Sequence, residues 1–408
     1  MSRRSRRFMI GGLAGAAAVG AAVIGLVVSD PSAGSKSLPT SSVLTDAKPA
    51  KAPAGLQFYV PPNRLIGKHG DLIWSRPLSG SVALTGAARN YLLLYRSTSI
   101  TGKAIAVSGT LSIPQGNAPK GGWPVISWAH GTTGVADLCA PSRTAVSYPQ
   151  LNAWLKAGYA IAGTDYEGLG TQGPAPYLIG ESEGRSVVDI VLASRQLVPS
   201  LSEDWVASGH SQGGQAALFA AALGPRWAPN LKLMGVDAFA PVSHAKTMVD
   251  LASRVTTPGG GLSALGALIV SGAAAASPST IKPADLLTPR AFKLFPQTET
   301  KCVAQLSAST SWGGLPLDDI ISPTYDRAPL NAVLTANEPS NLHITVPTLI
   351  QQGTADTQVF KSFTDLLVSS LKADGAKVDY KTYQGVGHSG VVVSGQADAT
   401  AWLKTVLK

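Results

Sequence analysis

Two serines of this 408-residue chain lie in the pattern Gly-x-Ser-x-Gly, which carries the nucleophile of many hydrolases: Ser182 and Ser211. The pattern can activate a serine when a strand precedes it, a helix follows it, and small residues on both sides permit a tight turn. The sequence DWVASG before Ser211 is typical of a buried strand, and QAALFAAAL after it is typical of a helix. Ser211 is therefore the predicted nucleophile.

The motif around Ser182 fits this requirement poorly. The preceding segment, GPAPYLI, contains two prolines and makes a poor buried strand. Glu181 and Glu183 would repel a developing oxyanion. They suit the first turn of a helix, where carboxylates meet the positive end of the helix dipole. We expect Ser182 to lie at the start of a helix and not to act as the nucleophile.

A serine nucleophile needs a general base and an acid that orients the base. His388 lies in the loop GVGHSG after the last expected strand and is the predicted base. Asp356 lies in the turn after the strand VPTLIQQG and is the predicted orienting acid; the alternative is that it caps the next helix. The other downstream candidates are worse placed: His244, His343, Asp365, Asp374 and Asp379.

An acyl-transfer site also needs two N–H groups that stabilise the oxyanion of the tetrahedral intermediate. One is expected from Gln212, the residue after the nucleophile. The other is expected from the loop HGTTG after the strand PVISWA, with Thr132 as the first choice and Thr133 as the second. The alternative is that this loop is an ordinary turn.

These residues must be positioned by a sheet, and the apolar runs come at the spacing of an α/β domain. Strands are expected at 91–95, 104–113, 124–129, 159–164, 205–209, 233–240, 347–352 and 378–384, the first two antiparallel. Helices are expected at 151–157, 181–197, 212–223, 358–372 and 396–407. The alternation predicts a mainly parallel sheet with helices on both faces, and a ligand site at the carboxyl ends of its strands.

Residues 242–345 interrupt this alternation, with Gly, Pro and Ala clusters and no clear strand. A segment this long indicates an inserted, mostly helical cap domain between two parts of the core, 55–241 and 346–408. The stretch 262–276 is apolar on nearly all sides and too short to span a membrane. It is either a buried helix or the wall of an acyl site, and its larger side chains are Leu262, Leu265, Leu268, Ile269 and Val270.

The first 30 residues indicate export. Four arginines precede an uncharged, mostly Ala, Gly, Val and Ile stretch, which is typical of a signal peptide or of an uncleaved membrane anchor. Arg6 and Arg7 resemble the start of a twin-arginine signal. Residues 31–54 are expected to form a linker. Outside the cytoplasm a disulfide can persist, so Cys139 and Cys302 are expected to pair; the alternative is two buried thiols.

Composition excludes several other classes of protein. Only 14% of the residues are charged, which argues against a disordered or coiled-coil chain. The formal charge of +9 is not gathered into a basic stripe with interleaved aromatic residues, so no nucleic-acid partner is expected. Two cysteines are too few for a cysteine-rich zinc module, and the proposed chemistry requires neither a metal nor a cofactor.

Taken together, the motifs resemble those of the secretory lipase family of fungi and actinobacteria. The resemblance covers about residues 55–408 and includes HGTTGVADLCAPS, TDYEGLGTQGPAPYLIGESEGRSVVD, GHSQGG, GTADTQV and GVGHSG. It implies an α/β-hydrolase fold with a helical cap, hydrolysis of triacylglycerols or simpler carboxylic esters, and a triad of Ser211, Asp356 and His388. The loop Asp165–Gly168 is a hallmark of the family, and we interpret it as structural.

The sequence thus predicts an exported serine ester hydrolase that acts on small-molecule or lipid esters. Two alternatives keep the fold: an acyltransferase or peptidase with the same triad, and a catalytically dead binding protein. The apolar N-terminal segment offers a route to membrane association.

Overall fold

A computed structural model describes residues 51–146 and 148–407, and in this part nine strands form one sheet. The order is β1-β2-β3-β5-β4-β6-β7-β8-β9. The strands are β1 (Leu72–Pro77), β2 (Arg89–Thr98), β3 (Ala104–Ile113), β4 (Trp123–Ala129), β5 (Ala160–Thr164), β6 (Leu201–His210), β7 (Lys232–Phe239), β8 (Thr348–Gly353) and β9 (Val378–Tyr383). The pairings β1–β2, β2–β3 and β3–β5 are antiparallel, and the remaining pairings are parallel.

The signal or anchor expected at residues 1–30 lies outside the described residues, as does the expected linker up to residue 50. None of the helices in the described ranges combines the length and the hydrophobicity that crossing a bilayer requires.

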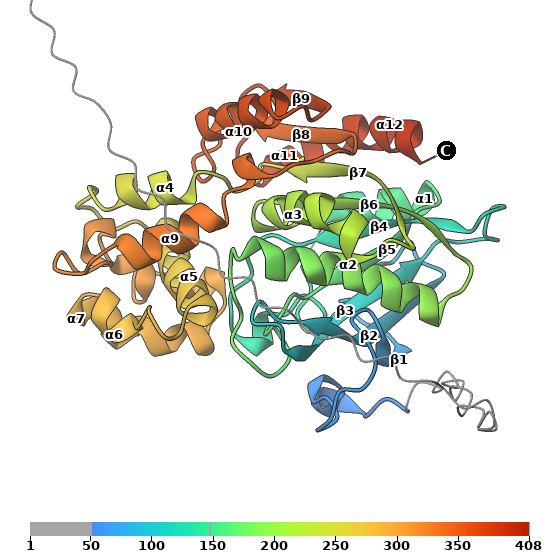
Figure 1. Cartoon of the computed structure of the whole chain (residues 1–408), viewed down its shortest axis with the longest axis horizontal. Coiled ribbons are helices and arrows are strands. Elements are labelled where there is room, and N and C mark those ends of the chain that lie inside the picture. The colour runs from blue at the N-terminus through green and yellow to red at the C-terminus, as the bar shows by residue number, and fades with distance from the viewer. Residues whose placement is uncertain (1–50, 147, 408) are drawn as a thin grey trace, which may run out of the picture. The chain divides into compact units, whose positions relative to one another are not determined.

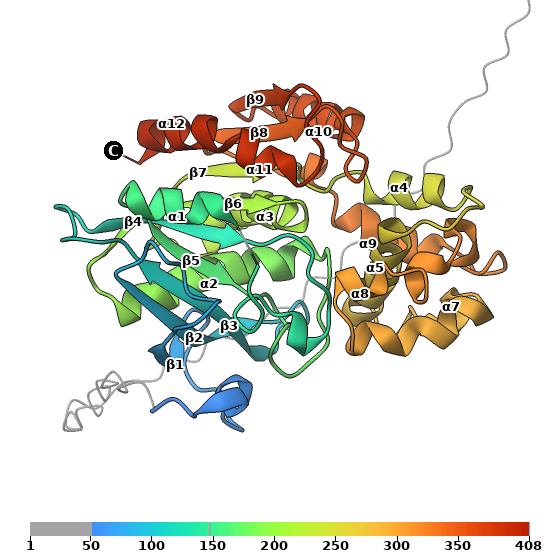
Figure 2. The same ribbon diagram turned by 180° about the vertical axis from the view of Figure 1, so that it is seen from behind.

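Helices cover both faces of the sheet. The helices of the core are α1 (Pro149–Lys156), α2 (Gly180–Leu197), α3 (Gln212–Trp227), α10 (Lys361–Ala373), α11 (Gly390–Ser394) and α12 (Gln396–Val406). Figure 1 shows α2 and α3 in front of the sheet, and Figure 2 shows α1, α11 and α12 on the other side. Each layer has its own apolar core: Val188 of α2 and Leu218 of α3 belong to one, and Trp154 of α1 and Trp402 of α12 to the other. A mainly parallel sheet between two helical layers is the predicted architecture.

The structure differs from the sequence prediction mainly at the margins of the sheet. The strand β1 was not predicted, because LIWSRP contains an arginine and a proline and its burial alternates, as is common for an edge strand. Other strands extend beyond the predicted apolar runs: β2 begins at Arg89 and β6 at Leu201. The helix α10 begins at Lys361 rather than at residue 358, and Asp356 lies in the loop before it, as predicted.

The segment between β7 and β8 is helical where the sequence predicts a cap. It contains α4 (Ala245–Ala252), α5 (Gly261–Ala276), α6 (Pro283–Leu286), α7 (Pro289–Leu294), α8 (Val303–Leu306) and α9 (Ala328–Ala336). Short 3₁₀ helices occur here and elsewhere: η1 (Gly55–Tyr59), η2 (Asp137–Cys139), η3 (Phe295–Glu299), η4 (Trp312–Gly314), η5 (Leu317–Asp319) and η6 (Pro339–Asn341). The helices between β7 and β8 share a hydrophobic cluster built around Leu268, Leu306 and Trp312. They lie together beside the sheet, in yellow and orange in Figure 1.

Cys139 and Cys302 form a disulfide, as the sequence predicts. Cys139 lies in η2, shortly after the loop that contains Thr132, and Cys302 immediately precedes α8 of the helical segment. A backbone hydrogen bond from Val303 N to Thr133 O, 2.8 Å long, lies beside it. The helical segment is therefore tied covalently to the loop that follows β4.

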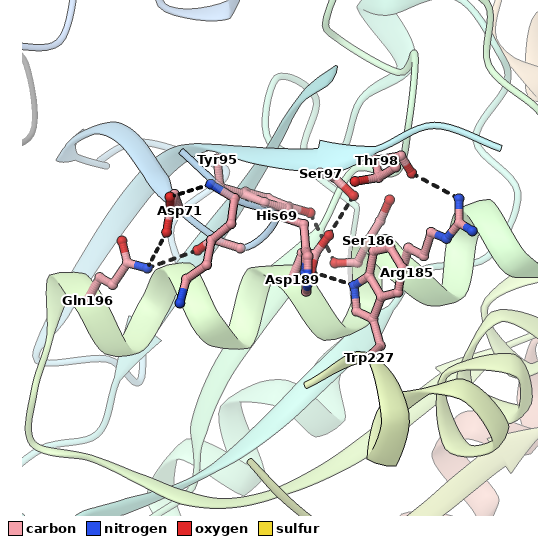
Figure 3. Close-up of polar contacts among 12 residues, drawn as sticks. His69, Asp71, Tyr95, Ser97, Thr98, Arg185, Ser186, Asp189, Gln196 and Trp227 are labelled. Carbon is pink, nitrogen blue, oxygen red and sulfur yellow. Dashed lines mark hydrogen bonds and ion pairs between the residues drawn. The ribbon is translucent and has the colours of Figure 1, made fainter. Parts of the chain in front are cut away.

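A fully buried carboxylate fixes α2 against its neighbours. Asp189 of α2 accepts hydrogen bonds from Ser97 Oγ on β2 (2.6 Å) and from Trp227 Nε1 at the end of α3 (2.8 Å), and Nδ1 of His69 lies 2.7 Å from it (Figure 3). Arg185, one turn earlier on α2, lies over the Trp227 ring. Because one carboxylate joins three elements, the position of α2 is set by polar contacts as well as by apolar packing.

Candidate active site

Ser211 lies in the sharp turn between β6 and α3. Its φ of 60° and ψ of −118° are unusual for a residue with a side chain and are typical of a strained nucleophile turn. The flanking glycines are required here: a Cβ on Gly209 would lie 2.2 Å from the Gly213 carbonyl oxygen, and a Cβ on Gly213 would lie 1.9 Å from the Ala129 carbonyl oxygen. This turn directs the serine toward the cavities described below.

The structure brings Ser211, His388 and Asp356 into one chain of hydrogen bonds. His388 Nε2 lies 2.9 Å from Ser211 Oγ, and His388 Nδ1 lies 2.7 Å from Asp356 Oδ2. Asp356 follows β8 and His388 follows β9, so the carboxyl ends of neighbouring parallel strands supply both. This arrangement permits His388 to remove the proton of Ser211 while Asp356 holds the imidazole in the required tautomer.

Asp356 also fixes the turn in which it lies. Its Oδ1 accepts hydrogen bonds from the N–H groups of Gln358 (2.8 Å) and Val359 (2.9 Å), and Gln352 Nε2 donates to Oδ2. Burial alone would raise the pKa of Asp356, but the bond to His388 and the two N–H groups together hold this pKa below its usual range. The Asp356 carboxylate is therefore ionised beside His388. The same side chain also stabilises the turn at residues 356–359 through its bonds to the two N–H groups.

The two expected oxyanion donors lie close to Ser211. Gln212 is the first residue of α3, and Thr132 lines a cavity together with Ser211 and His388. Neither backbone N–H donates a hydrogen bond to any other described residue. The Thr132 hydroxyl lies 2.8 Å from the hydroxyl of Tyr177, which fixes the loop after β4. Both N–H groups are thus uncommitted within the described part of the chain, as an oxyanion site requires.

His210 is a neighbour of the site that the sequence analysis did not single out, although it lies within the Ser211 motif. Its ring lies 4.7 Å from that of His388, and its Nε2 donates to the His388 carbonyl oxygen at 3.0 Å. Burial, with the neighbouring His388, lowers the pKa of His210 to about 4. A neutral His210 can therefore hold the His388 backbone without adding a second positive charge.

The other candidate residues lie in different surroundings. Ser182 is buried in the first turn of α2, as predicted, and donates to the Glu167 carboxylate. His343 pairs with Asp374 on the surface, and His244 stacks on Phe363. None of these groups contacts Ser211 in the hydrogen-bond network.

The loop Asp165–Gly168 is held by buried polar contacts. Asp165 accepts hydrogen bonds from Ser108 Oγ (2.6 Å) and Ser142 N (2.9 Å), and burial raises its pKa to about 6. Glu167 accepts from Ser182. These contacts are consistent with a structural role. Within the described ranges no three His, Cys, Asp or Glu side chains are grouped as a metal site would need.

Two cavities meet at Ser211. The first has a volume of about 440 Å³, and its lining is almost entirely apolar, with contributions from α4, α5 and α9. Leu262, Leu265, Ile269 and Val270 line it, but Leu268 does not: its side chain is fully buried within the helical segment. The second, about 740 Å³, has more polar walls, which include Tyr148, Ser307, Thr357 and Ser389. Ser211 therefore lies between an apolar and a mixed chamber.

Comparison with known proteins identifies relatives of the chain. A family model described as Secretory lipase matches residues 140–408. Lipase A of Moesziomyces aphidis is 28% identical over 222 residues, 50% of this chain and 45% of that protein, so the match spans less than half of the relative. A protein of Mycobacterium tuberculosis named a probable inactive lipase is 26% identical over 352 residues, 80% of this chain and 74% of that protein.

Solved structures confirm the predicted fold class. Candida antarctica lipase A in its closed state superposes with a TM-score of 0.69 at 20% identity, covering 83% of this chain and 82% of that chain. The rice cell wall degrading esterase LipA from Xanthomonas oryzae gives a TM-score of 0.68 at 20% identity and covers 83% and 98%. The described part of the chain has an α/β-hydrolase fold.

Proposed function

The chain belongs to the secretory lipase family, and from this premise we propose that it is an exported serine ester hydrolase, which cleaves carboxylic esters of lipid-like substrates through an acyl-enzyme on Ser211. The observation that carries the proposal is the hydrogen-bonded series Asp356–His388–Ser211 beside an apolar cavity. Export is assigned to residues 1–30, where four arginines precede the apolar stretch.

The mechanism follows from the positions of the protons. His388 takes the proton of Ser211 Oγ through Nε2 as the oxygen attacks the ester carbonyl carbon, and Asp356 stabilises the imidazolium that forms. The N–H groups of Gln212 and Thr132 stabilise the oxyanion. His388 then protonates the alkoxide as the C–O bond breaks. Water hydrolyses the acyl-enzyme by the same steps, which returns the proton to Ser211.

We assign the acyl chain to the 440 Å³ cavity, because its walls are apolar and Ser211 is part of them. Each methylene moved from water into such walls contributes about 0.8 kcal/mol, or roughly fourfold in affinity. The leaving alcohol is assigned to the second, more polar cavity. On this division the helical segment selects the acyl length, and the core performs the chemistry.

The proposal is tested by treating the protein with a fluorophosphonate probe and by assaying p-nitrophenyl esters beside peptide anilides. We expect one equivalent of label on Ser211, turnover of the esters and no turnover of the anilides. Added alcohols would reveal acyl transfer as a change in product. A protein that is neither labelled nor active would contradict the proposal and would match the catalytically dead alternative.

Replacing Ile269 with tryptophan should shorten the preferred acyl chain. The larger side chain fills the apolar cavity, so kcat/KM for long-chain esters should fall by tenfold or more while acetate esters are hardly affected. A p-nitrophenyl ester series measures the change. Ala275→Trp, on the same helix outside the cavity lining, is the matched control. Equal loss for acetate and long esters in Ile269→Trp would mean that α5 is structural and that the acyl chain binds elsewhere.

A further inference from the structure

The Ser182 motif contains a second acid, Glu183, which the mechanism leaves without a role. Glu183 lies in the first turn of α2 and its side chain is fully buried. Its Oε1 accepts one hydrogen bond from Gln212 Nε2 (2.7 Å) and another from Leu178 N (2.9 Å). Its Oε2 has no hydrogen-bond partner among the described residues. A buried carboxyl oxygen without a hydrogen-bond partner is unusual in a folded protein, so the state of this group needs an explanation.

The two hydrogen-bond donors to Glu183, Gln212 Nε2 and Leu178 N, each belong to or adjoin a residue that positions an oxyanion donor. Gln212 is itself one of the donor residues. Leu178 follows Tyr177, whose hydroxyl lies 2.8 Å from Oγ1 of Thr132, the other donor residue. The backbone at Leu178 has a φ of 59°, an unusual value for leucine that the hydrogen bond to Glu183 helps to hold. The Glu183 carboxyl group is therefore connected to both oxyanion donor residues, directly to Gln212 and through Leu178 and Tyr177 to Thr132.

Among the residues that the structure describes, no cation lies beside Glu183 to favour its charged form. The titratable groups that face it are Tyr166 from the loop after β5, Tyr177 from the loop before α2, and Glu167, which lines the same small cavity. The contact from α3 is the uncharged Gln212. Arg185 is turned away and bonds to Glu181 and to the carbonyl oxygens of Thr98 and Ser99.

We propose that Glu183 is a positioning residue, which holds the oxyanion donors Gln212 and Thr132 as an uncharged carboxylic acid. A neutral group leaves the site free of negative charge, whereas a carboxylate would oppose the oxyanion that forms nearby. The inference rests on the proposed function, because it requires that Ser211 attack an ester.

Burial raises the pKa of Glu183 to about 8, in agreement with the uncharged form at neutral pH. As the pH rises through this value the group ionises, so kcat should fall on the alkaline side. The free energy of unfolding should change as well. A carboxyl whose pKa is raised in the folded state stabilises the fold fully below its unfolded pKa, and this contribution is lost as the pH rises through the folded pKa.

The experiment compares Glu183→Gln and Glu183→Leu with the native protein across pH. Glutamine keeps an oxygen that can accept both hydrogen bonds and cannot ionise. It should retain kcat near pH 7, keep its activity above pH 8, and lose less thermal stability than the native protein as the pH rises from 5 to 8. Leucine removes both hydrogen bonds and should lower kcat by about 10²-fold, with little change in KM. Fluorophosphonate labelling should slow in parallel, because the probe also develops an oxyanion.

The controls separate Glu183 from its neighbours. Glu181→Gln, in the same helical turn but half exposed, should leave the pH profile unchanged. Glu167→Gln should leave the alkaline decline in place. The inference is overturned if this decline persists in Glu183→Gln, if it disappears in Glu167→Gln instead, or if folded Glu183→Leu keeps its kcat. Should Glu183→Leu not fold, the pH profile of Glu183→Gln decides alone. An inactive, unlabelled native protein would instead refute the proposed function.

Discussion

Replacing Ser211 with alanine is expected to lower ester turnover by about 10⁶-fold, because the loss of a triad nucleophile typically has this cost. The fold should persist. The turn at Ser211 is set by Gly209 and Gly213, and within the described ranges the Ser211 side chain forms no hydrogen bond other than the one to His388. The expected loss is measured as kcat for a short p-nitrophenyl ester, and circular dichroism verifies that the variant is folded.

Ser182→Ala is the matched control, since it removes the same hydroxyl from the other Gly-x-Ser-x-Gly motif. It deletes a partly buried hydrogen bond to Glu167 and should reduce stability by about 1 kcal/mol, with kcat near the native value. Reversed phenotypes, an inactive Ser182→Ala and an active Ser211→Ala, would show that the nucleophile is assigned to the wrong serine.

Asp356→Asn should lower turnover by about 10⁴-fold. The asparagine side-chain oxygen can still accept from Gln358 N and Val359 N, so the turn is kept. Its NH₂ group then faces His388 Nδ1, which favours the tautomer with the proton on Nε2, and that nitrogen can no longer accept the proton of Ser211. A kcat measurement across pH, in a variant whose melting temperature is close to native, checks this expectation.

Asp365→Asn provides the comparison, because Asp365 is the next acid along the chain and lies on α10, where it pairs with Lys361 and Tyr380. Its substitution should leave kcat nearly unchanged. An active Asp356→Asn beside an inactive Asp365→Asn would move the orienting role to a different acid.

The sequence identified the elements of the core because their signals are local. Each of Ser211, Asp356 and His388 follows a strand that the sequence predicts, and parallel strands bring their carboxyl ends to one edge of the sheet. A one-dimensional pattern was therefore enough to predict which side chains meet. The strand β1 was not predicted because it lies at the edge of the sheet. It pairs with one neighbouring strand and is buried on one face, so fewer contacts constrain which residues it contains.

Contacts between side chains of elements that are far apart in the sequence could not be predicted from local sequence patterns. The bond between Glu183 and Gln212 depends on how α2 packs against α3, and both residues look ordinary in their own helices. The helix α5 illustrates the same limit. It is apolar on nearly every side, so no periodicity distinguishes Leu268, which is buried in the helical segment, from Ile269, which lines the cavity.

The order of the strands along the chain also has a consequence for the cell that makes the protein. The turn with Ser211 and the loop with Thr132 precede the helical segment, whereas Asp356 and His388, in the loops after β8 and β9, follow it. During synthesis from the N-terminus, a growing polypeptide would hold its nucleophile without a base until the last part is made. On the proposed assignment, an unfinished or C-terminally clipped chain is inert toward the esters of its own producer, and lipolytic activity begins only with the completed molecule.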